Sequence, residues 1–119
     1  MRVKDLVGQF GEDVAVGWLV DSGLRVLDRN WRCPDGELDV VADDAGTVVF
    51  VEVKTRSTAA FGDPAEAVTA AKASRIHRLA ARWLSEHRDV RAEEMRFDIV
   101  SVVRERRGAV TVNHFPAAF

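Results

Sequence analysis

The chain has little cysteine and little lysine, and it has no long apolar run. Its single cysteine, Cys33, cannot close an intramolecular disulfide, which is typical of a protein kept in a reducing compartment. No apolar run approaches the roughly 20 residues that a membrane-spanning helix needs. The first residues also lack the apolar region of a secretory signal. We therefore expect a cytoplasmic protein without a membrane partner.

Three catalytic signatures are missing as well. The histidines have no spacing with Cys33 that would indicate a zinc site. No G-x-S-x-G turn presents a serine nucleophile. No glycine-rich loop follows a strand to hold phosphates. These absences argue against zinc, serine-nucleophile and nucleotide-binding chemistry, and we expect no small-molecule cofactor.

Composition is that of one globular domain, residues 1–119, because 47% of the residues are hydrophobic and 30% are charged. The net charge of −2 argues against a strongly basic coat for nucleic acid, but it allows a local basic surface. Among the 17 basic residues, all except Lys4, Lys54 and Lys72 are arginines. This bias either serves phosphate recognition by guanidinium groups or reflects the base composition of the genome.

The hydrophobic pattern predicts a helix over 4–21, with an apolar side made of Leu6, Val7, Phe10, Val14 and Trp18. Ser22-Gly23 would end this helix. Strands are predicted over 24–31, 37–42 and 47–54, separated by turns over 33–36 and 43–46. The continuous apolar run over 48–51 is typical of a central strand covered on both faces.

The second half contains a loop over 57–63 and then a helical region over 64–87 that is broken near Thr69. Two further strands are predicted over 95–103 and 109–115, with a turn near 107–108. The order is helix, three strands, helix, two strands. It predicts an α/β fold of the α+β type, in which helices flank a central mixed sheet.

Charged residues interrupt two of the apolar strands. Side chains alternate along a strand, so Glu37 and Asp39 share one face of their strand, and Glu52 and Lys54 share one face of theirs. Pairing the two strands as a hairpin would bring Asp39, Glu52 and Lys54 together. Unpaired buried charge is costly, so such a gathering indicates a bound cation with a lysine that handles an anionic substrate.

Phosphodiester hydrolysis would explain this combination, because one divalent metal can activate water and neutralise charge on the phosphoryl oxygens. Mg²⁺, or Mn²⁺ in its place, prefers oxygen ligands and takes one or two carboxylates together with waters. We expect Asp39 and Glu52 as ligands, the backbone carbonyl of Val53 as a third, and Lys54 beside them. Glu12, on a side of the first helix with small neighbours, and Glu37 are further candidate ligands.

Simpler interpretations stay open for each of these residues. An acid–x–lysine pattern such as Glu52 and Lys54 also occurs on exposed strands, as an ion pair worth under about 1 kcal/mol. Glu12 alone could be an ordinary surface glutamate. A stripe of arginines on the later helix is either a solvated face or a phosphate track, and it consists of Arg75, Arg78 and Arg82.

Several blocks of the chain together resemble the YraN family, also called UPF0102. They are Gly11-Glu12-x-x-Ala15, Arg29-Asn30-Trp31-Arg32, Gly36-Glu37-Leu38-Asp39, Phe50-Val51-Glu52-Val53-Lys54-Thr55-Arg56, Phe61-Gly62-x-Pro64-x-Glu66-Ala67-Val68 with Lys72, Arg96-Phe97-Asp98-Ile99-Val100 and His114-Phe115-Pro116-x-Ala118-Phe119. The resemblance covers nearly the whole chain. It implies a nuclease-like domain with the restriction-endonuclease-like fold, similar to archaeal Holliday-junction resolvases.

Carried over by position, the resemblance implies a magnesium site and a catalytic set of Glu12, Asp39, Glu52 and Lys54. Lys72 and Arg56 flank the strand and helix of this site, and we expect them to contact phosphates. Arg32 and Arg75 are further candidate contacts. The block that contains Arg32 is either a DNA-facing strand end or a tightly packed turn.

The sequence is compatible with two functions. One is a metal-dependent endonuclease that acts on DNA, with branched or single-stranded structures as substrates. The other is a non-catalytic module, on a nuclease scaffold, that binds nucleic acid or protein. A homodimer is a further expectation, because a DNA junction has twofold symmetry and apolar residues gather late in the chain. They are Val110, Val112, Phe115 and Phe119.

Overall fold

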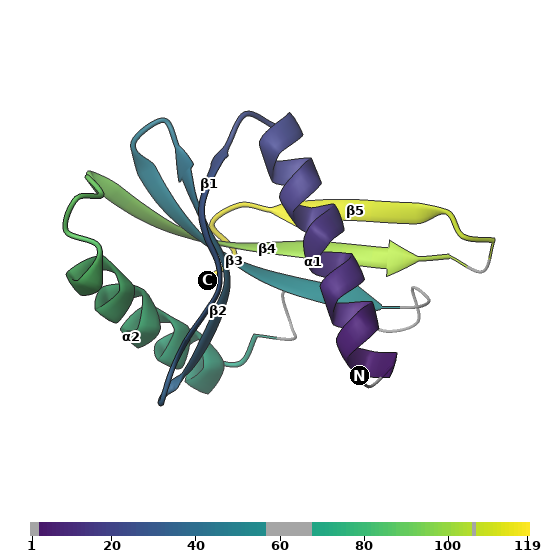
Figure 1. Ribbon diagram of the computed structural model, residues 1–119, viewed down its shortest axis with the longest axis horizontal. Coiled ribbons are helices and arrows are strands. Elements are labelled where there is room, and N and C mark those ends of the chain that lie inside the picture. Colours follow the sequence, from purple (N-terminus) through teal and green to yellow (C-terminus); the bar gives the residue numbers. More distant parts are fainter. Residues whose placement is uncertain (1–2, 57–67, 106) are drawn as a thin grey trace.

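The computed structural model describes residues 3–56, 68–105 and 107–119 (Figure 1). Its elements are α1 (Val3–Asp21), β1 (Arg25–Cys33), β2 (Gly36–Asp44), β3 (Thr47–Arg56), α2 (Ala70–Glu86), β4 (Glu94–Arg104) and β5 (Val110–Phe115). Every predicted element in these ranges is present with bounds near the predicted ones. The predicted loop over 57–63 and the first residues of the predicted second helix, 64–67, lie outside the described residues. No helix among those described is long and apolar enough to cross a membrane.

All five strands form one mixed sheet in the order β1-β2-β3-β4-β5. The first three strands are an antiparallel meander, β4 pairs with β3 in parallel, and β5 returns antiparallel to β4. The predicted α+β architecture with a mixed sheet is therefore confirmed. The prediction that β3 is central is also confirmed, because the side chains of its run over 48–51 are at most 3% exposed.

Each face of the sheet carries one helix. Residues at positions 49 and 51 of β3 pack with α1, whereas Val48 and Phe50 pack with the apolar side of α2. This division follows from the alternation of side chains along a strand. It assigns the odd-numbered residues of β3 to the α1 face and the even-numbered residues to the α2 face.

Turns and caps follow the residue types that the sequence offers. Gly23 has a φ of 97° and ends α1 in the left-handed region, as its glycine predicts. The two-residue turn between β2 and β3 needs positive φ at both positions, and Ala45 and Gly46 supply it at 50° and 100°. Thr69 caps α2 by accepting a hydrogen bond from the Lys72 amide, so this helix begins where the break was predicted.

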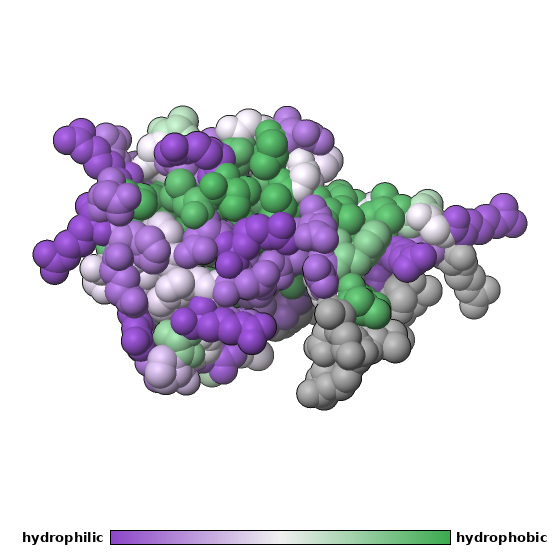
Figure 2. Space-filling model, in the orientation of Figure 1, coloured by the Kyte–Doolittle hydropathy of each residue, from purple (hydrophilic) through white to green (hydrophobic). Residues whose placement is uncertain are grey.

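The predicted apolar side of α1 meets the sheet only in part, because Phe10 and Val14 pack against the core while its other large residues are exposed. Trp18 is 42% exposed and Leu6 is 52% exposed, while the fully buried side chains of this helix are Ala15 and Leu19. Figure 2 shows apolar residues reaching the surface on the side of the molecule where α1 lies. At Gly11 the helix approaches Thr55 of β3 so closely that a side chain would clash, whereas the larger Phe10, Val14 and Leu19 pack on the core elsewhere along the helix.

Gly11 sets the distance between α1 and β3. A Cβ at this position would lie 1.8 Å from the Thr55 hydroxyl oxygen and 2.7 Å from the Thr55 Cβ. Gly11→Ala should therefore push the helix off the sheet and lower the free energy of unfolding by about 2–3 kcal/mol, despite the better helix propensity of alanine.

Urea denaturation measures this cost, with Gly8→Ala as the matched control on the same helix. A Cβ at Gly8 would meet nothing within 4 Å, so this variant should be stabilised by about 0.5–1 kcal/mol. Equal behaviour of the two variants would contradict a close contact at Gly11.

A buried carboxylate fastens the last residues of the chain to the sheet. Asp98 of β4 is fully buried and is bridged at both oxygens by the Arg96 guanidinium, at 2.9 and 3.0 Å. The His114 Nε2 of β5 lies 2.7 Å from it, and the Ala117 amide donates a hydrogen bond of 2.9 Å. Arg96 also reaches Asp44 at 3.0 Å. The arrangement connects β2, β4, β5 and the final turn through one charged group.

Candidate active site

The meander opens into a fork at Asp39, the charged residue that precedes the apolar part of β2. Main-chain pairing of β2 with β3 ends at Val40 and Val51, and the two strands diverge beyond this pair (Figure 1). In place of the missing strand partner, the Asp39 carboxylate accepts a hydrogen bond of 2.9 Å from the Val53 amide. Asp39 is thus held between the diverging strands, where either face of the sheet is within reach.

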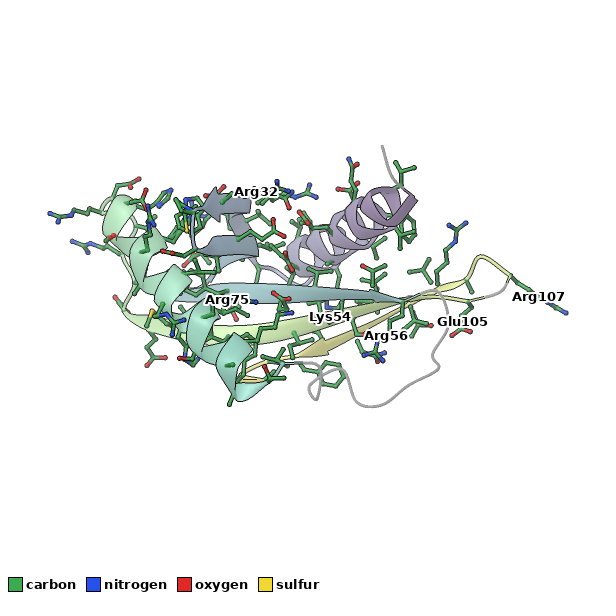
Figure 3. All side chains as sticks on the ribbon, turned by 90° about the horizontal axis from the view of Figure 1, so that it is seen from below. Arg32, Lys54, Arg56, Arg75, Glu105 and Arg107 are labelled. Atoms are coloured by element: carbon green, nitrogen blue, oxygen red, sulfur yellow. The ribbon has the colours of Figure 1, made fainter. Side chains whose placement is uncertain are left out.

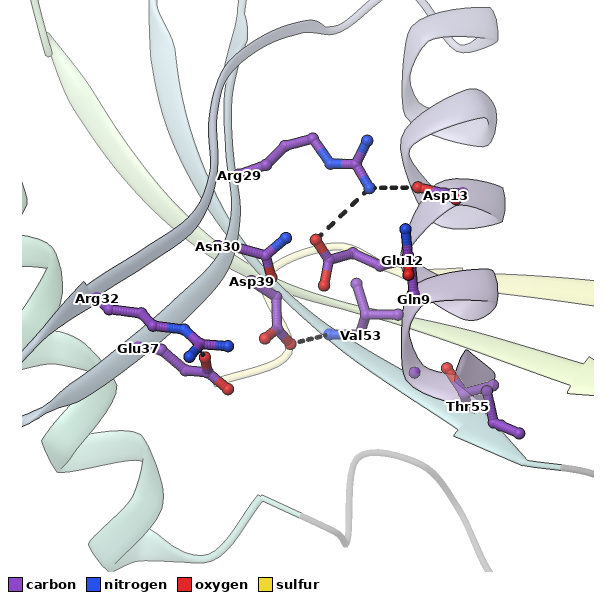
Figure 4. A pocket seen from close by; sticks show the side chains of 12 residues that line it. Gln9, Glu12, Asp13, Arg29, Asn30, Arg32, Glu37, Asp39, Val53 and Thr55 are labelled. Carbon is purple, nitrogen blue, oxygen red and sulfur yellow. Dashed lines mark hydrogen bonds and ion pairs between the residues drawn. The ribbon is translucent and has the colours of Figure 1, made fainter. Parts of the chain in front are cut away.

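An open groove of about 1290 Å³ lies on the α1 side of this fork. Figure 4 shows that Glu12 comes from α1, Asn30 from β1 and Asp39 from β2, and that their polar groups point toward one another. Glu37 and Arg32 form the rim of the groove, with an ion pair of 3.1 Å between two exposed side chains. The prediction that Glu12 could reach the cluster is supported by this placement, whereas Glu37 lies in a solvated position.

Glu12 is a buried acid that lacks a full set of partners. The residue is 9% exposed, and its Oε1 is the one buried side-chain oxygen or nitrogen without a hydrogen-bond partner in the described part of the chain. The Arg29 guanidinium lies 3.6 Å from that oxygen but makes its short contact, 2.6 Å, with Asp13. Burial raises the pKa of Glu12, although Arg29 and the Asn30 side chain oppose the shift.

Asp39 has the most perturbed carboxyl of the groove. Its burial and the nearby Glu52 carboxylate raise its pKa to about 7, while the Val53 amide works in the opposite direction. Glu12 and Glu37 add smaller repulsions in the same sense as Glu52. A carboxyl whose ionisation is hindered by burial and by neighbouring acids is typical of a site that becomes stable with a cation.

Glu52 and Lys54 lie on the other face of β3, the face of α2. The Glu52 Oε1 lies 2.8 Å from the Lys72 Nζ and 3.4 Å from the Lys54 Nζ. Burial and the neighbouring Lys72 lower the pKa of Lys54, and Glu52 opposes this shift. Burial also lowers the pKa of Lys72, yet its hydrogen bonds with Glu52 and Lys54 outweigh that effect, so its pKa is raised overall. The alternative interpretation of Glu52 and Lys54 as an exposed ion pair is therefore wrong, because their side chains are only 14% and 23% exposed.

The predicted constellation is thus divided by β3. Glu12 and Asp39 line the groove on one side of β3, and Glu52 and Lys54 lie on the other side. In the fork, burial and the carboxylates of both Glu52 and Glu12 raise the pKa of Asp39. Val53 contributes its amide to Asp39, and its carbonyl remains a predicted ligand. Sequence spacing alone did not indicate this division, because the twist that separates β2 from β3 depends on the fold.

The predicted arginine contacts differ in their surroundings. Arg75 lies exposed on α2, as do Arg78, which is bonded to Ser74 at 3.0 Å, and Arg82, which pairs with Glu86 at 3.2 Å. All three side chains are exposed, so they are accessible to solvent and to a phosphate backbone alike. Figure 3 shows Lys54 and Arg56 along β3, and Arg107 at the far tip of the β4–β5 hairpin.

Oxygen donors are the only candidate ligands at the fork, and they fit a hard cation such as Mg²⁺. In residues 3–56, 68–105 and 107–119, no three acidic, histidine or cysteine side chains lie close enough to enclose an ion. Mg²⁺ commonly completes its shell with water and phosphate oxygens, so two carboxylates suffice. The unpartnered oxygen of Glu12 and the hindered ionisation of Asp39 are consistent with such a site.

Arg29 and Asn30 are site residues to which the sequence assigned no definite role. They lie within β1, so the interpretation of this block as a packed turn is wrong. Asn30 has a φ of 51°, in the left-handed region that asparagine tolerates better than most residues. This kink lies beside Asp39 and directs the Asn30 amide toward Glu12.

Two variants separate the backbone role of Asn30 from its side-chain role. Asn30→Ala should cost about 1 kcal/mol of unfolding free energy through left-handed strain, and Asn30→Gly should restore it. Both variants lose the contact with Glu12, so both should shift the pKa of Glu12 upward in an NMR titration. An unshifted Glu12 in both would mean that Asn30 acts on the backbone alone.

Comparison with known proteins gives a likeness along nearly the whole chain. Residues 11–102 match the model of a family described as "Uncharacterised protein family UPF0102". A UPF0102 protein of Beutenbergia cavernae is 61% identical over 114 residues, 96% of each chain. A UPF0102 protein of Frankia casuarinae is 53% identical over 119 residues, all of both chains, and one of Arthrobacter sp. (strain FB24) is 47% identical over 114 residues. The matched range contains Glu12, Asp39, Glu52, Lys54 and Lys72.

Proposed function

The chain belongs to the UPF0102 family, and from the carboxylates at its strand fork we propose that it is a Mg²⁺- or Mn²⁺-dependent endonuclease acting on DNA. The carrying observation is Asp39, fixed in the fork with its ionisation hindered by burial and by the carboxylates of Glu52 and Glu12. We also propose a restriction-endonuclease-like core. The mixed sheet, with α1 on one face and α2 on the other, supports that finer assignment.

Each residue would have a distinct role in this reaction. Asp39 and Glu52 would hold the cation, with the Val53 carbonyl and Glu12 as further oxygen ligands. A bound divalent cation supplies activation of water and neutralisation of phosphoryl charge. Lys54, whose pKa is lowered by burial, would orient the attacking water beside the phosphate.

Binding of the DNA backbone would involve residues around the site. Arg56 at the end of β3 and Lys72 at the start of α2 are the proposed phosphate contacts nearest to Lys54. Arg32 on the groove rim and Arg75 on the exposed side of α2 are proposed for phosphates farther away. Branched or single-stranded DNA is the proposed substrate, because no element in the described ranges is added to the sheet and its two helices for reading duplex sequence.

Cleavage assays test the function directly. Purified protein with Mn²⁺ or Mg²⁺ should cut at least one of branched, flapped or linear DNA, and the isosteric variants Asp39→Asn and Glu52→Gln should not. Activity that persists in both variants would place the chemistry elsewhere. An exposed carboxylate on the rim provides the matched control, and Glu37→Gln should cut at nearly the wild-type rate.

A non-catalytic binding module is the second candidate. The net charge of −2 and the engagement of Glu52 by two lysines favour it, because a carboxylate already neutralised needs no cation. Calorimetry discriminates between the two functions. No heat of binding with Mg²⁺ or Mn²⁺ at millimolar concentration would favour the binding module.

A dimer would give a junction-cutting enzyme its two sites. Of the predicted contact residues, Val110 is 40% exposed, but Phe119 packs on Phe97 and the α2-side core. The proposal therefore rests on Val110 and its neighbours in β5, and not on the final phenylalanine. Light scattering during gel filtration tests it, and a strict monomer would reject this version.

A further inference from the structure

The buried stripe of α2 contains one charged residue. Ile76, Leu79 and Trp83 of this helix are at most 5% exposed and pack on the sheet. Lys72 lies one turn before Ile76, so helical spacing places it on the same side of the helix. A lysine at such a position needs an anionic partner, since its ammonium would otherwise be poorly solvated.

Glu52 is that partner. Its Oε1 lies 2.8 Å from the Lys72 Nζ, and the two side chains are 14% and 25% exposed. The same oxygen is 3.4 Å from the Lys54 Nζ, so two ammonium groups share one carboxylate oxygen. The shorter contact belongs to the lysine on the helix, not to the lysine on the same strand.

A cation and the Lys72 ammonium cannot both bind the Glu52 Oε1 strongly at the same time. A divalent ion beside two ammonium groups would also repel them. Lys72 makes the shorter of the two contacts with this oxygen, so it competes most directly with a cation there. Lys54 makes the longer contact. The exchange would leave Lys72 with its charge and without its carboxylate.

We propose that Lys72 is a displaceable counter-ion for Glu52: it holds the carboxylate in the metal-free protein, and it turns to a DNA phosphate once the carboxylate binds metal. This inference rests on the proposed function and deepens it. It makes Lys72 a positioning residue for Glu52 before metal binding and a substrate contact afterwards. Metal and DNA would then each favour binding of the other, because both require Lys72 to leave Glu52.

Metal titration without DNA gives the first test. Lys72→Met should bind Mn²⁺ about fivefold more tightly than the wild type, since the competing ion pair is gone. Removing any positive charge nearby would also help a cation, so Arg78→Met on the exposed face of α2 is the matched control, and its gain should be clearly smaller. Lys72→Gln serves as a second variant if Lys72→Met folds poorly. Equal Mn²⁺ affinities of Lys72→Met and Arg78→Met would overturn the proposal.

DNA binding gives the second test. A labelled branched DNA is titrated by fluorescence anisotropy, with Ca²⁺ as a metal that commonly supports binding without cleavage, and again with chelator. Lys72→Met should lose several-fold more affinity with Ca²⁺ than with chelator, because Lys72 is available to DNA only in the metal-bound protein. An equal loss in both conditions would reject the exchange.

These outcomes remain distinguishable from failure of the proposed function. Wild type that binds no metal, or that binds it equally well as Asp39→Asn, would reject the metal site and the exchange together. Wild type that binds metal at Asp39, with an affinity unaffected by Lys72→Met, would reject the exchange alone.

Discussion

Asp39→Asn should abolish cleavage and at the same time make the metal-free protein more stable at about pH 8. The asparagine keeps the shape of the side chain and an oxygen that accepts the hydrogen bond from the Val53 amide. It removes the negative charge that burial and Glu52 make unfavourable. Metal affinity should fall by about a hundredfold or more, because even partners outside the ligand shell are worth 10–100-fold.

The pH dependence follows from the direction of the shift. The pKa of Asp39 is raised from 3.8 to about 7 in the folded protein. The folded state therefore holds this proton more tightly than the unfolded state does. Its contribution to stability is complete below pH 3.8 and is lost as pH rises through about 7. The loss, of the order of 3–4 kcal/mol, is what Asp39→Asn should recover above that range.

Urea denaturation at about pH 5 and about pH 8, in the presence of chelator, measures this recovery. The gap between variant and wild type should be wider at the higher pH. Glu37→Gln is the control, because Glu37 is an exposed carboxylate in the same strand and should change stability by less than about 0.5 kcal/mol. A variant that is equally destabilised at both pH values would contradict the raised pKa.

The second large effect is expected far from the fork. Asp98→Asn should lower the free energy of unfolding at neutral pH by about 3–5 kcal/mol, because it leaves the Arg96 guanidinium partly buried beside a neutral group. It also weakens the connection of His114 and the Ala117 amide to β4. Chemical denaturation measures the loss, and near-ultraviolet circular dichroism reports whether the final turn stays packed.

Acid should weaken the same cluster in the wild type. Burial by itself raises the pKa of Asp98, but Arg96, the Ala117 amide and His114 together hold it below its usual value. Stability from this group is thus present above its unfolded pKa of 3.8 and is lost as pH falls through the lower folded value. Asp44→Asn removes the more exposed partner of Arg96 and should cost under about 1 kcal/mol. A similar cost for both variants would show that burial of Asp98 is unimportant.

The sequence predicted the elements well because their signals are local. Period-two alternation, the run over 48–51 and the turn residues at 45–46 each depend on neighbours in the chain. The apolar side of α1 was predicted correctly only in part, for a physical reason. Periodicity counts large apolar residues such as Trp18, whereas the closest contact with the sheet is made at Gly11 and Ala15.

The site was predictable as a set of residues but not as an arrangement. Asp39 lies near enough to Glu52 for their charges to interact, although β2 and β3 are not paired at these two residues. No spacing rule connects Glu52 with Lys72, which lies on a different element. The role of Asp98 was missed because it depends on contacts with Arg96 and His114. These contacts form only when the strands pair in the folded sheet.

The fork also gives the protein an internal reporter. The Val53 amide proton lies in the middle of the sheet, yet a carboxylate holds it instead of a strand. Its NMR chemical shift and its hydrogen-exchange rate should therefore follow the charge on Asp39, while the amides of neighbouring residues in the ladder follow global unfolding. The resonance of this one amide would thus report whether Asp39 is protonated and whether a cation is bound in the groove, without any substrate.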